Sequence, residues 1–153
     1  MVKFVRPTQK LIEQIAADMR QSDVDEVWAS HRHTPLQSLT SAMSSSDYRA
    51  VVVAGGVPIA ALGLRMNSYL SDEGVPWLLS TNEALKHKRE FLANTAEVIS
   101  DMLMLSPRLV NYVHANNKLS IRWLKWIGFT IDEPAESPVS KELFHKFHMT
   151  KVL

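Results

Sequence analysis

The sequence predicts a mixed α/β fold, α+β in character, in which one sheet is covered by helices on both faces. Three observations predict it. Two strongly β-forming segments flank a glycine turn, stripes of helical spacing precede this pair, and helical and extended segments alternate after it. No internal repeat and no linker interrupts the chain. We therefore expect a single domain over residues 1–153.

The first third of the chain predicts one short strand followed by two or three helices. The strand covers residues 2–5. Thr8 can cap the first helix, because its hydroxyl accepts from a free amide of the first turn. Ser22 or Asp23 could cap a second helix, and Pro35 is placed to begin a third.

The middle of the chain contains the strongest hairpin signal. Residues 48–54 and 59–66 are rich in β-branched or apolar residues, and Gly55-Gly56 lies between them. We expect these two segments to pair as an antiparallel hairpin. Residues 75–81 should form a third strand of this group.

The last part alternates helices and strands. We expect a helix over 83–105, a strand over 109–115, a short helix over 120–127, a strand over 129–131, a polar loop over 133–138 and a last strand over 143–152. Trp123 and Trp126 on the short helix should pack in the core and at its rim. Gly128 should end this helix with positive φ, which glycine adopts without strain.

Composition excludes several classes of function. The formal net charge is +1, which gives no reason to expect nucleic acid or an anionic membrane as the main partner. The absence of cysteine excludes disulfides, thiolate metal sites and a cysteine nucleophile. The N-terminus lacks the features of a signal peptide, and the apolar stretch 50–64 is too short and interrupted to span a membrane. We expect a soluble protein.

One segment carries a specific resemblance to known proteins. Residues 113–129 contain Asn117, then a short amphipathic helix, then Ile127-Gly128-Phe129. The segment resembles the strand–helix–strand segment of the GNAT superfamily of acetyl-CoA-dependent N-acetyltransferases, and the order of predicted elements is similar to theirs. This resemblance implies a three-layer sandwich with a mixed, mostly antiparallel sheet of six or seven strands. It also implies acetyl-CoA as cofactor and a protein or small amine as acceptor.

A closer resemblance rests on three segments in order. Arg6-Pro7-Thr8, the basic tract 86–91 and residues 117–128 are similar to segments of the small GNAT-like internal virion (core) protein A family of short-tailed phages. This resemblance implies a phage-encoded protein in the host cytoplasm or the virion interior. It implies a virion or host protein as partner.

The cofactor site of GNAT proteins usually includes a Gln/Arg-x-x-Gly-x-Gly/Ala loop that binds pyrophosphate through backbone amides. The corresponding residues 80–89 contain no glycine, so the loop is degenerate and side chains would have to hold the phosphates. The alternative is a solvated basic helix face. The resemblance places the candidate cofactor-binding residues at Leu79, Ser80, Thr81, Lys86, Lys88, Arg89 and Asn117.

Catalytic groups are incomplete. The GNAT tyrosine that protonates the leaving thiolate aligns with Leu124, which has no proton to give, and Tyr112 is badly spaced to replace it. His114 at a strand end and Glu83 beyond the strand 75–81 are the candidate bases. The alternative for His114 is a hydrogen-bonded structural residue.

Two hypotheses of function remain, with a third behind them. The first is an acyl-CoA-dependent N-acetyltransferase. The second is a catalytically silent GNAT-like assembly or host-interaction protein, and the third is a CoA-binding regulator without turnover. No metal is expected, because His31-x-His33 and His145-x-x-His148 lack the carboxylate or cysteine partners that would specify a site.

Overall fold

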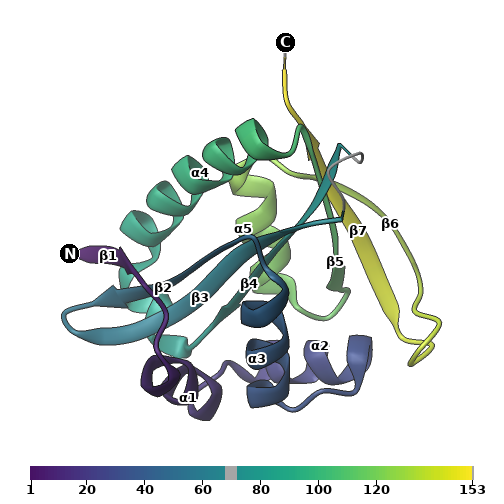
Figure 1. Ribbon diagram of the computed structural model, residues 1–153. Coiled ribbons are helices and arrows are strands. Elements are labelled where there is room, and N and C mark those ends of the chain that lie inside the picture. The colour runs from purple at the N-terminus through teal and green to yellow at the C-terminus, as the bar shows by residue number, and fades with distance from the viewer. Residues whose placement is uncertain (68–71, 153) are drawn as a thin grey trace.

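The computed structural model describes residues 1–67 and 72–152, and its elements alternate broadly as expected (Figure 1). In chain order they are β1 (Val2–Val5), α1 (Gln9–Ala17), α2 (Gln21–His31), α3 (Pro35–Ser45), β2 (Tyr48–Ala54), β3 (Val57–Met66), β4 (Glu73–Ser80), the 3₁₀ helix η1 (Asn82–His87), α4 (Lys88–Leu105), β5 (Arg108–His114), α5 (Lys118–Ile127), β6 (Thr130–Glu136) and β7 (Leu143–Thr150).

Seven strands form one sheet in the order β1-β2-β3-β4-β5-β7-β6. Every neighbouring pair is antiparallel except β4 and β5, which are parallel. The predicted hairpin is confirmed: β2 pairs with β3 across a turn in which Gly55 and Gly56 have φ of 56° and 80°. The predicted fold class is therefore confirmed, with a mixed and mostly antiparallel sheet.

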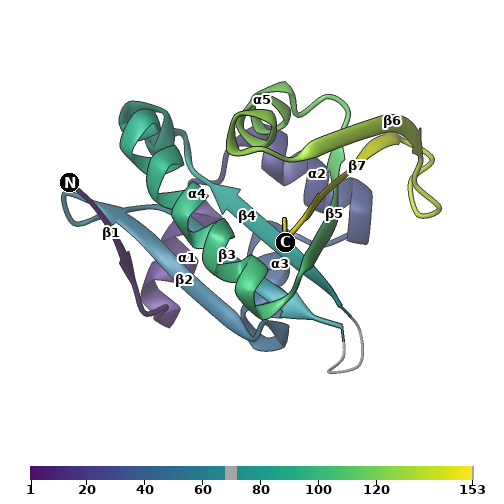
Figure 2. The ribbon, with the colours of Figure 1, turned by 90° about the horizontal axis from the view of Figure 1, so that it is seen from above.

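Helices cover both faces of the sheet (Figures 1 and 2). Successive strand residues point to opposite faces, so Val51 joins one apolar cluster and Val52 the other. The first cluster holds side chains of α1, α2 and α3, and the second holds side chains of α4 and α5. The two clusters fix the three-layer arrangement, because each helix buries its apolar stripe against one face.

Helix starts were predicted in part. The Thr8 hydroxyl caps α1, and Pro35 is the first residue of α3, as expected. The expected cap of α2 at Ser22 or Asp23 is wrong. Arg20 is the N-cap of α2 and makes no side-chain capping bond, while the Asp23 carboxylate is turned toward the sheet and used there.

Two segments differ from the expectation. The helix expected over 83–105 begins as η1, because the Thr81 hydroxyl accepts from the Glu83 amide and the Thr81 carbonyl from Ala84, which tightens the first turn. The loop expected over 133–138 is largely strand, since β6 continues to Glu136. β6 pairs with β7 alone, and such an edge strand tolerates Pro134 and an exposed, polar sequence.

Candidate functional site

A split opens in the sheet between β4 and β5. These strands pair only at their first residues, where Glu73 lies opposite Arg108 and Gly74 opposite Leu109. Beyond that point the strands run apart (Figure 2). Parallel strands that separate in this way leave backbone groups of both edges facing the gap, so other polar groups must satisfy them.

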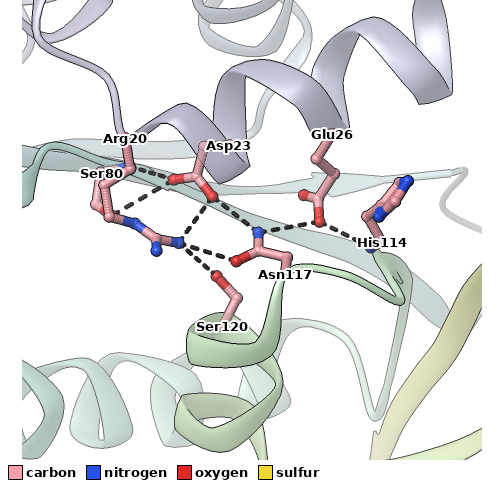
Figure 3. A network of polar contacts seen from close by, with 7 residues as sticks. All are labelled: Arg20, Asp23, Glu26, Ser80, His114, Asn117 and Ser120. Atoms are coloured by element: carbon pink, nitrogen blue, oxygen red, sulfur yellow. Dashed lines mark hydrogen bonds and ion pairs between the residues drawn. The ribbon is translucent and has the colours of Figure 1, made fainter.

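The side chain of Arg20 lies between the end of β4 and the first turn of α5, at the open end of this split (Figure 3). Its backbone amide donates to the Ser80 carbonyl over 2.9 Å, and its Nε donates to Ser80 Oγ over 3.1 Å. Its Nη2 donates to Asp23 Oδ1, Asn117 Oδ1 and Ser120 Oγ at 3.0, 3.2 and 2.9 Å. Arg20 is 5% exposed. The guanidinium therefore joins the ends of β4, α2 and α5 in one buried network.

Asp23 balances the charge of Arg20 from the first turn of α2. Its Oδ2 accepts from the Ser80 amide over 3.0 Å, and its Oδ1 accepts from Asn117 Nδ2 over 3.0 Å as well as from Arg20. Burial raises the pKa of Asp23, and the Arg20 guanidinium opposes that rise. Both backbone groups of Ser80 are thus bonded to α2 and its cap instead of facing an open gap.

Glu26 continues the network toward β5 (Figure 3). Its Oε1 accepts from the His114 amide over 2.8 Å and from Asn117 Nδ2 over 3.2 Å. Burial, together with the negative charge of Asp23, raises the pKa of Glu26 to about 7. A carboxyl group of that pKa can take up or release a proton near neutral pH.

His114, a predicted base, is engaged at both ring nitrogens. Nδ1 accepts from the Asn116 amide over 3.0 Å, so the ring proton lies on Nε2, which donates to Glu142 Oε1 over 2.9 Å. The ring also packs edge-on against Phe144, with 5.0 Å between centroids. This geometry supports the alternative of a hydrogen-bonded structural histidine.

Asn117, a predicted cofactor ligand, is committed to the same network. It is 1% exposed, its Oδ1 accepts from Arg20, and its Nδ2 donates to Asp23 and Glu26. Both hydrogens of its side-chain amide are therefore used within the protein.

The other predicted site residues lie around the far end of β4. Leu79 is buried in the apolar cluster of α1, α2 and α3, and Thr81 caps η1 while its hydroxyl also donates to the Ile59 carbonyl. Glu83, the second predicted base, forms an exposed 2.9 Å ion pair with Lys86. Among the described residues no hydrogen bond joins Glu83 to His114. Lys88 and Arg89 are exposed on the first turn of α4.

Sequence reasoning missed Arg20 and Glu26, and it treated Asp23 only as a cap. A signal for them exists. The three residues are spaced by three, which places them on one side of α2, and Val27 of the same helix is buried. Charged residues on the side of a helix that faces the sheet indicate a buried polar network.

A pocket of about 510 Å³ opens beside this network. Its lining includes Trp28 and Asp25 of α2 together with His114, Asn116 and Glu142. Its remaining lining residues are Ser22, Val24, His33, Thr34, Pro35 and Asn117. The pocket therefore combines two carboxylates with an exposed indole next to the closed split.

The polar groups at the end of β4 are bonded within the protein. Arg20 lies at the open end of the split, the backbone groups of Ser80 are taken, and η1 replaces a loop of free amides. One buried donor remains free. Within residues 1–67 and 72–152, Trp123 Nε1 is the sole buried side-chain nitrogen or oxygen without a hydrogen-bond partner. It lies on α5, where the Arg20 guanidinium is 5.4 Å from the indole ring.

The histidine pairs form no metal site among the described residues. In the described part of the chain, no group of three or more His, Asp or Glu side chains could hold a metal ion. His31 and His33 stack on each other at 5.6 Å, while His145 and His148 both bond to Asp132. None of the described helices is long and apolar enough to cross a membrane.

Comparisons with known proteins agree with this architecture. No family model matches the sequence, and no curated protein does. Solved structures do match. A GNAT-family acetyltransferase from Bacillus anthracis has a TM-score of 0.67 at 12% identity, covering 96% of this chain and 92% of that chain. A chimera of the Vibrio cholerae spermidine N-acetyltransferase gives 0.69 at 10%, covering 97% and 95%.

A third match was solved with CoA bound. This Bacillus subtilis acetyltransferase has a TM-score of 0.65 at 8% identity, covering 99% of this chain and 98% of that chain. Identities this low carry the fold and nothing finer. Together with the seven-stranded split sheet and its two helical layers, they show that this chain has the fold of the GNAT acetyltransferases.

Proposed function

We propose that this protein is a GNAT-fold binding domain whose acyl-transfer cleft is closed, and that it acts by contact with a protein partner. The observation that carries the proposal is the position of Arg20. Its guanidinium lies between the end of β4 and the first turn of α5, at the open end of the split where the resemblance to GNAT proteins would place the acyl group. The side chains of Ser80, Asp23, Asn117 and Ser120 hold it there.

The energy of this network explains why a thioester would bind poorly. Separating a buried Arg–carboxylate pair costs about 3–5 kcal/mol, because one charge is left without compensation. A ligand that displaced Arg20 would have to offset that cost. A penalty of about 3 kcal/mol alone would weaken its affinity by more than about a hundredfold. Leu124 in the place of the GNAT tyrosine also removes the expected acid.

The partner class follows from the phage resemblance of residues 6–8, 86–91 and 117–128. We propose a virion or host protein as the partner, and the host cytoplasm or virion interior as the location. A phage origin and a role in assembly or host interaction belong to this proposal.

A second candidate is an acyl-CoA-dependent N-acetyltransferase acting on a small amine or a protein. Two observations favour it. Trp123 Nε1 is a buried donor that a ligand acceptor between α4 and α5 could satisfy. Glu26, with a pKa of about 7, has the proton affinity that a general base needs, and it adjoins residues of the pocket. In this reading Arg20 must leave the split before acetyl-CoA enters.

Titration with acetyl-CoA separates the two candidates. We expect neither binding heat nor a rise in melting temperature for the wild type. A ligand present at a hundred times its Kd would stabilise the protein by about 2.7 kcal/mol, so binding would be plain. Binding together with release of free CoA thiol in the presence of spermidine would overturn the closed-cleft proposal.

Two variants locate any binding that is seen. R20L/D23N removes both charges from the split, and a folded R20L/D23N protein that gains acetyl-CoA binding would identify Arg20 as the obstacle. K86A/K88A/R89A removes the candidate phosphate ligands. Affinity that falls in this variant, and falls in the wild type with added salt, would place the phosphates at η1 and the start of α4.

A further inference from the structure

The outward face of α5 carries a continuous basic stripe. Lys118, Arg122 and Lys125 are exposed, and Trp126 extends the stripe at 61% exposure. At ~100° of rotation per residue, these four positions fall within an arc of about 100°. The opposite side of the helix buries Trp123 in the core and directs Ser120 toward Arg20. The basic face is therefore fixed outward by the packing of α5.

The three cations of this stripe have no acidic partner among the described residues. No ion pair among the described residues involves Lys118, Arg122 or Lys125, and α5 contains no acidic residue. The whole chain has a formal charge of +1, so without these three cations it would carry −2. The small net charge therefore hides a local concentration of positive charge, and such patches attract polyanions.

Two further cations lie on the element next to α5. Phe91 of α4 contacts Trp123 of α5 edge-on, with ring centroids 5.7 Å apart, so the first turn of α4 lies beside the middle of α5. Figure 2 shows both helices on the same side of the sheet. Lys88 and Arg89 are exposed on that first turn, and no ion pair of the described residues involves them.

We propose that this stripe is a binding surface for single-stranded nucleic acid, in which Lys118, Arg122 and Lys125 contact phosphates and the indole of Trp126 stacks on a base. Proteins that bind single strands without sequence preference combine a basic track with exposed aromatic side chains in this way. The proposal does not rest on the closed-cleft function, because the stripe and the split are on opposite sides of α5.

The exposed indole favours a single strand over the other polyanions. A duplex keeps its bases stacked on each other, so Trp126 would have no base to meet. A membrane-surface helix needs a free apolar face, and the apolar face of α5 is buried in the core. Trp126 was expected at the rim of the core, yet its exposure is high for a residue with that role.

The test is fluorescence anisotropy of a labelled oligothymidine titrated with the full chain. We expect binding at 50 mM salt that weakens roughly twentyfold at 200 mM, the dependence for about three phosphate contacts to a single strand. K118Q/R122Q/K125Q should abolish most of the binding. Trp126→Ala should weaken it about fivefold or more, and Trp126→Phe should restore part of that loss.

A matched variant controls for net charge. K10Q/K141Q/K146Q removes the same number of cations from other parts of the surface and should bind like the wild type. An equal loss in the two triple variants would overturn the proposal, as would no binding by the wild type at 50 mM salt. Equal affinity for a duplex would overturn the role of Trp126. Preference for phosphatidylserine vesicles over the oligonucleotide would identify a membrane surface instead, and the proposal would fall.

Discussion

The polar residues expected to bind a cofactor lie in two regions that differ in their bonding. In the split, Ser80 and Asn117 are buried, and their polar groups bond to side chains from α2 and its cap. At the start of α4, Lys88 and Arg89 are exposed and form no ion pair with the described residues. Burial makes the difference, because a buried polar group must find a protein partner while an exposed one is satisfied by water.

The largest expected effect tests the buried region. Asp23→Asn keeps the shape of the side chain but removes the counter-ion of Arg20, which stays buried. We expect the free energy of unfolding in urea to fall by about 3–5 kcal/mol. Asp25→Asn on the same helix is the control, since Asp25 is exposed and should change stability by less than about 0.5 kcal/mol. Equal effects at the two positions would show that water reaches Arg20 and that the two regions do not differ.

A second prediction uses pH. The folded protein raises the pKa of Glu26 from 4.5 to about 7, so the native state binds more protons than the unfolded state between these values. Stability therefore falls as pH rises from about 4.5 to 7. Glu26→Gln cannot ionise and should be more stable than wild type at pH 8, by up to about 3 kcal/mol for a pKa shift of this size, with little difference at pH 4.

Several neighbouring groups set the pKa of Glu26 and therefore this pH profile. Asp23 raises its pKa, while Arg20 and the bonds from His114 and Asn117 lower it. Glu13→Gln, on an exposed part of α1, provides the control and should leave the pH profile of the wild type unchanged. If Glu26→Gln keeps the wild-type slope, another group is responsible for it.

Local patterns explain how much of the fold was predictable. The β2–β3 hairpin was predicted because strand-forming residues flank a two-glycine turn, and the end of α5 because Gly128 follows an amphipathic stripe. β6 was missed beyond residue 131, since an edge strand shows no apolar alternation. The helix over 83–105 was predicted, but its 3₁₀ start depends on how the Thr81 hydroxyl is used.

The candidate site was less predictable because its contacts join residues far apart in the chain. Arg20 meets Ser80 sixty positions away and Ser120 one hundred positions away, so no short motif contains them. Asn117 was singled out by resemblance to a ligand-binding family, yet its amide serves the protein itself. The resemblance located the right region, and only packing decided which partner each group has.

A third prediction concerns the backbone at Gly128, where we expect an effect on stability between those at the buried and the exposed regions. Gly128 ends α5 with φ of 121°, and its amide donates to the Leu124 and Lys125 carbonyls. An alanine there would be strained whatever space it has, although Met149 Cε at 3.4 Å can move aside. Gly128→Ala should lower the free energy of unfolding by about 1 kcal/mol or more. A neutral result in urea unfolding would mean that another backbone conformation is available to this turn.

The smallest effect is expected at the exposed cations. The double variant K88A/R89A removes two positive charges from the first turn of α4. Positive charges there are repelled by the positive end of the helix dipole. Alanine also has high helix propensity. Both terms favour the variant slightly, so its free energy of unfolding should lie within about 0.5 kcal/mol of wild type and on the stable side. The difference in free energy of unfolding between the variant and the wild type should shrink with added salt, because salt screens the repulsion between these cations and the helix dipole. A loss of 1 kcal/mol or more would mean that these side chains have structural partners, and the contrast with the buried network would disappear.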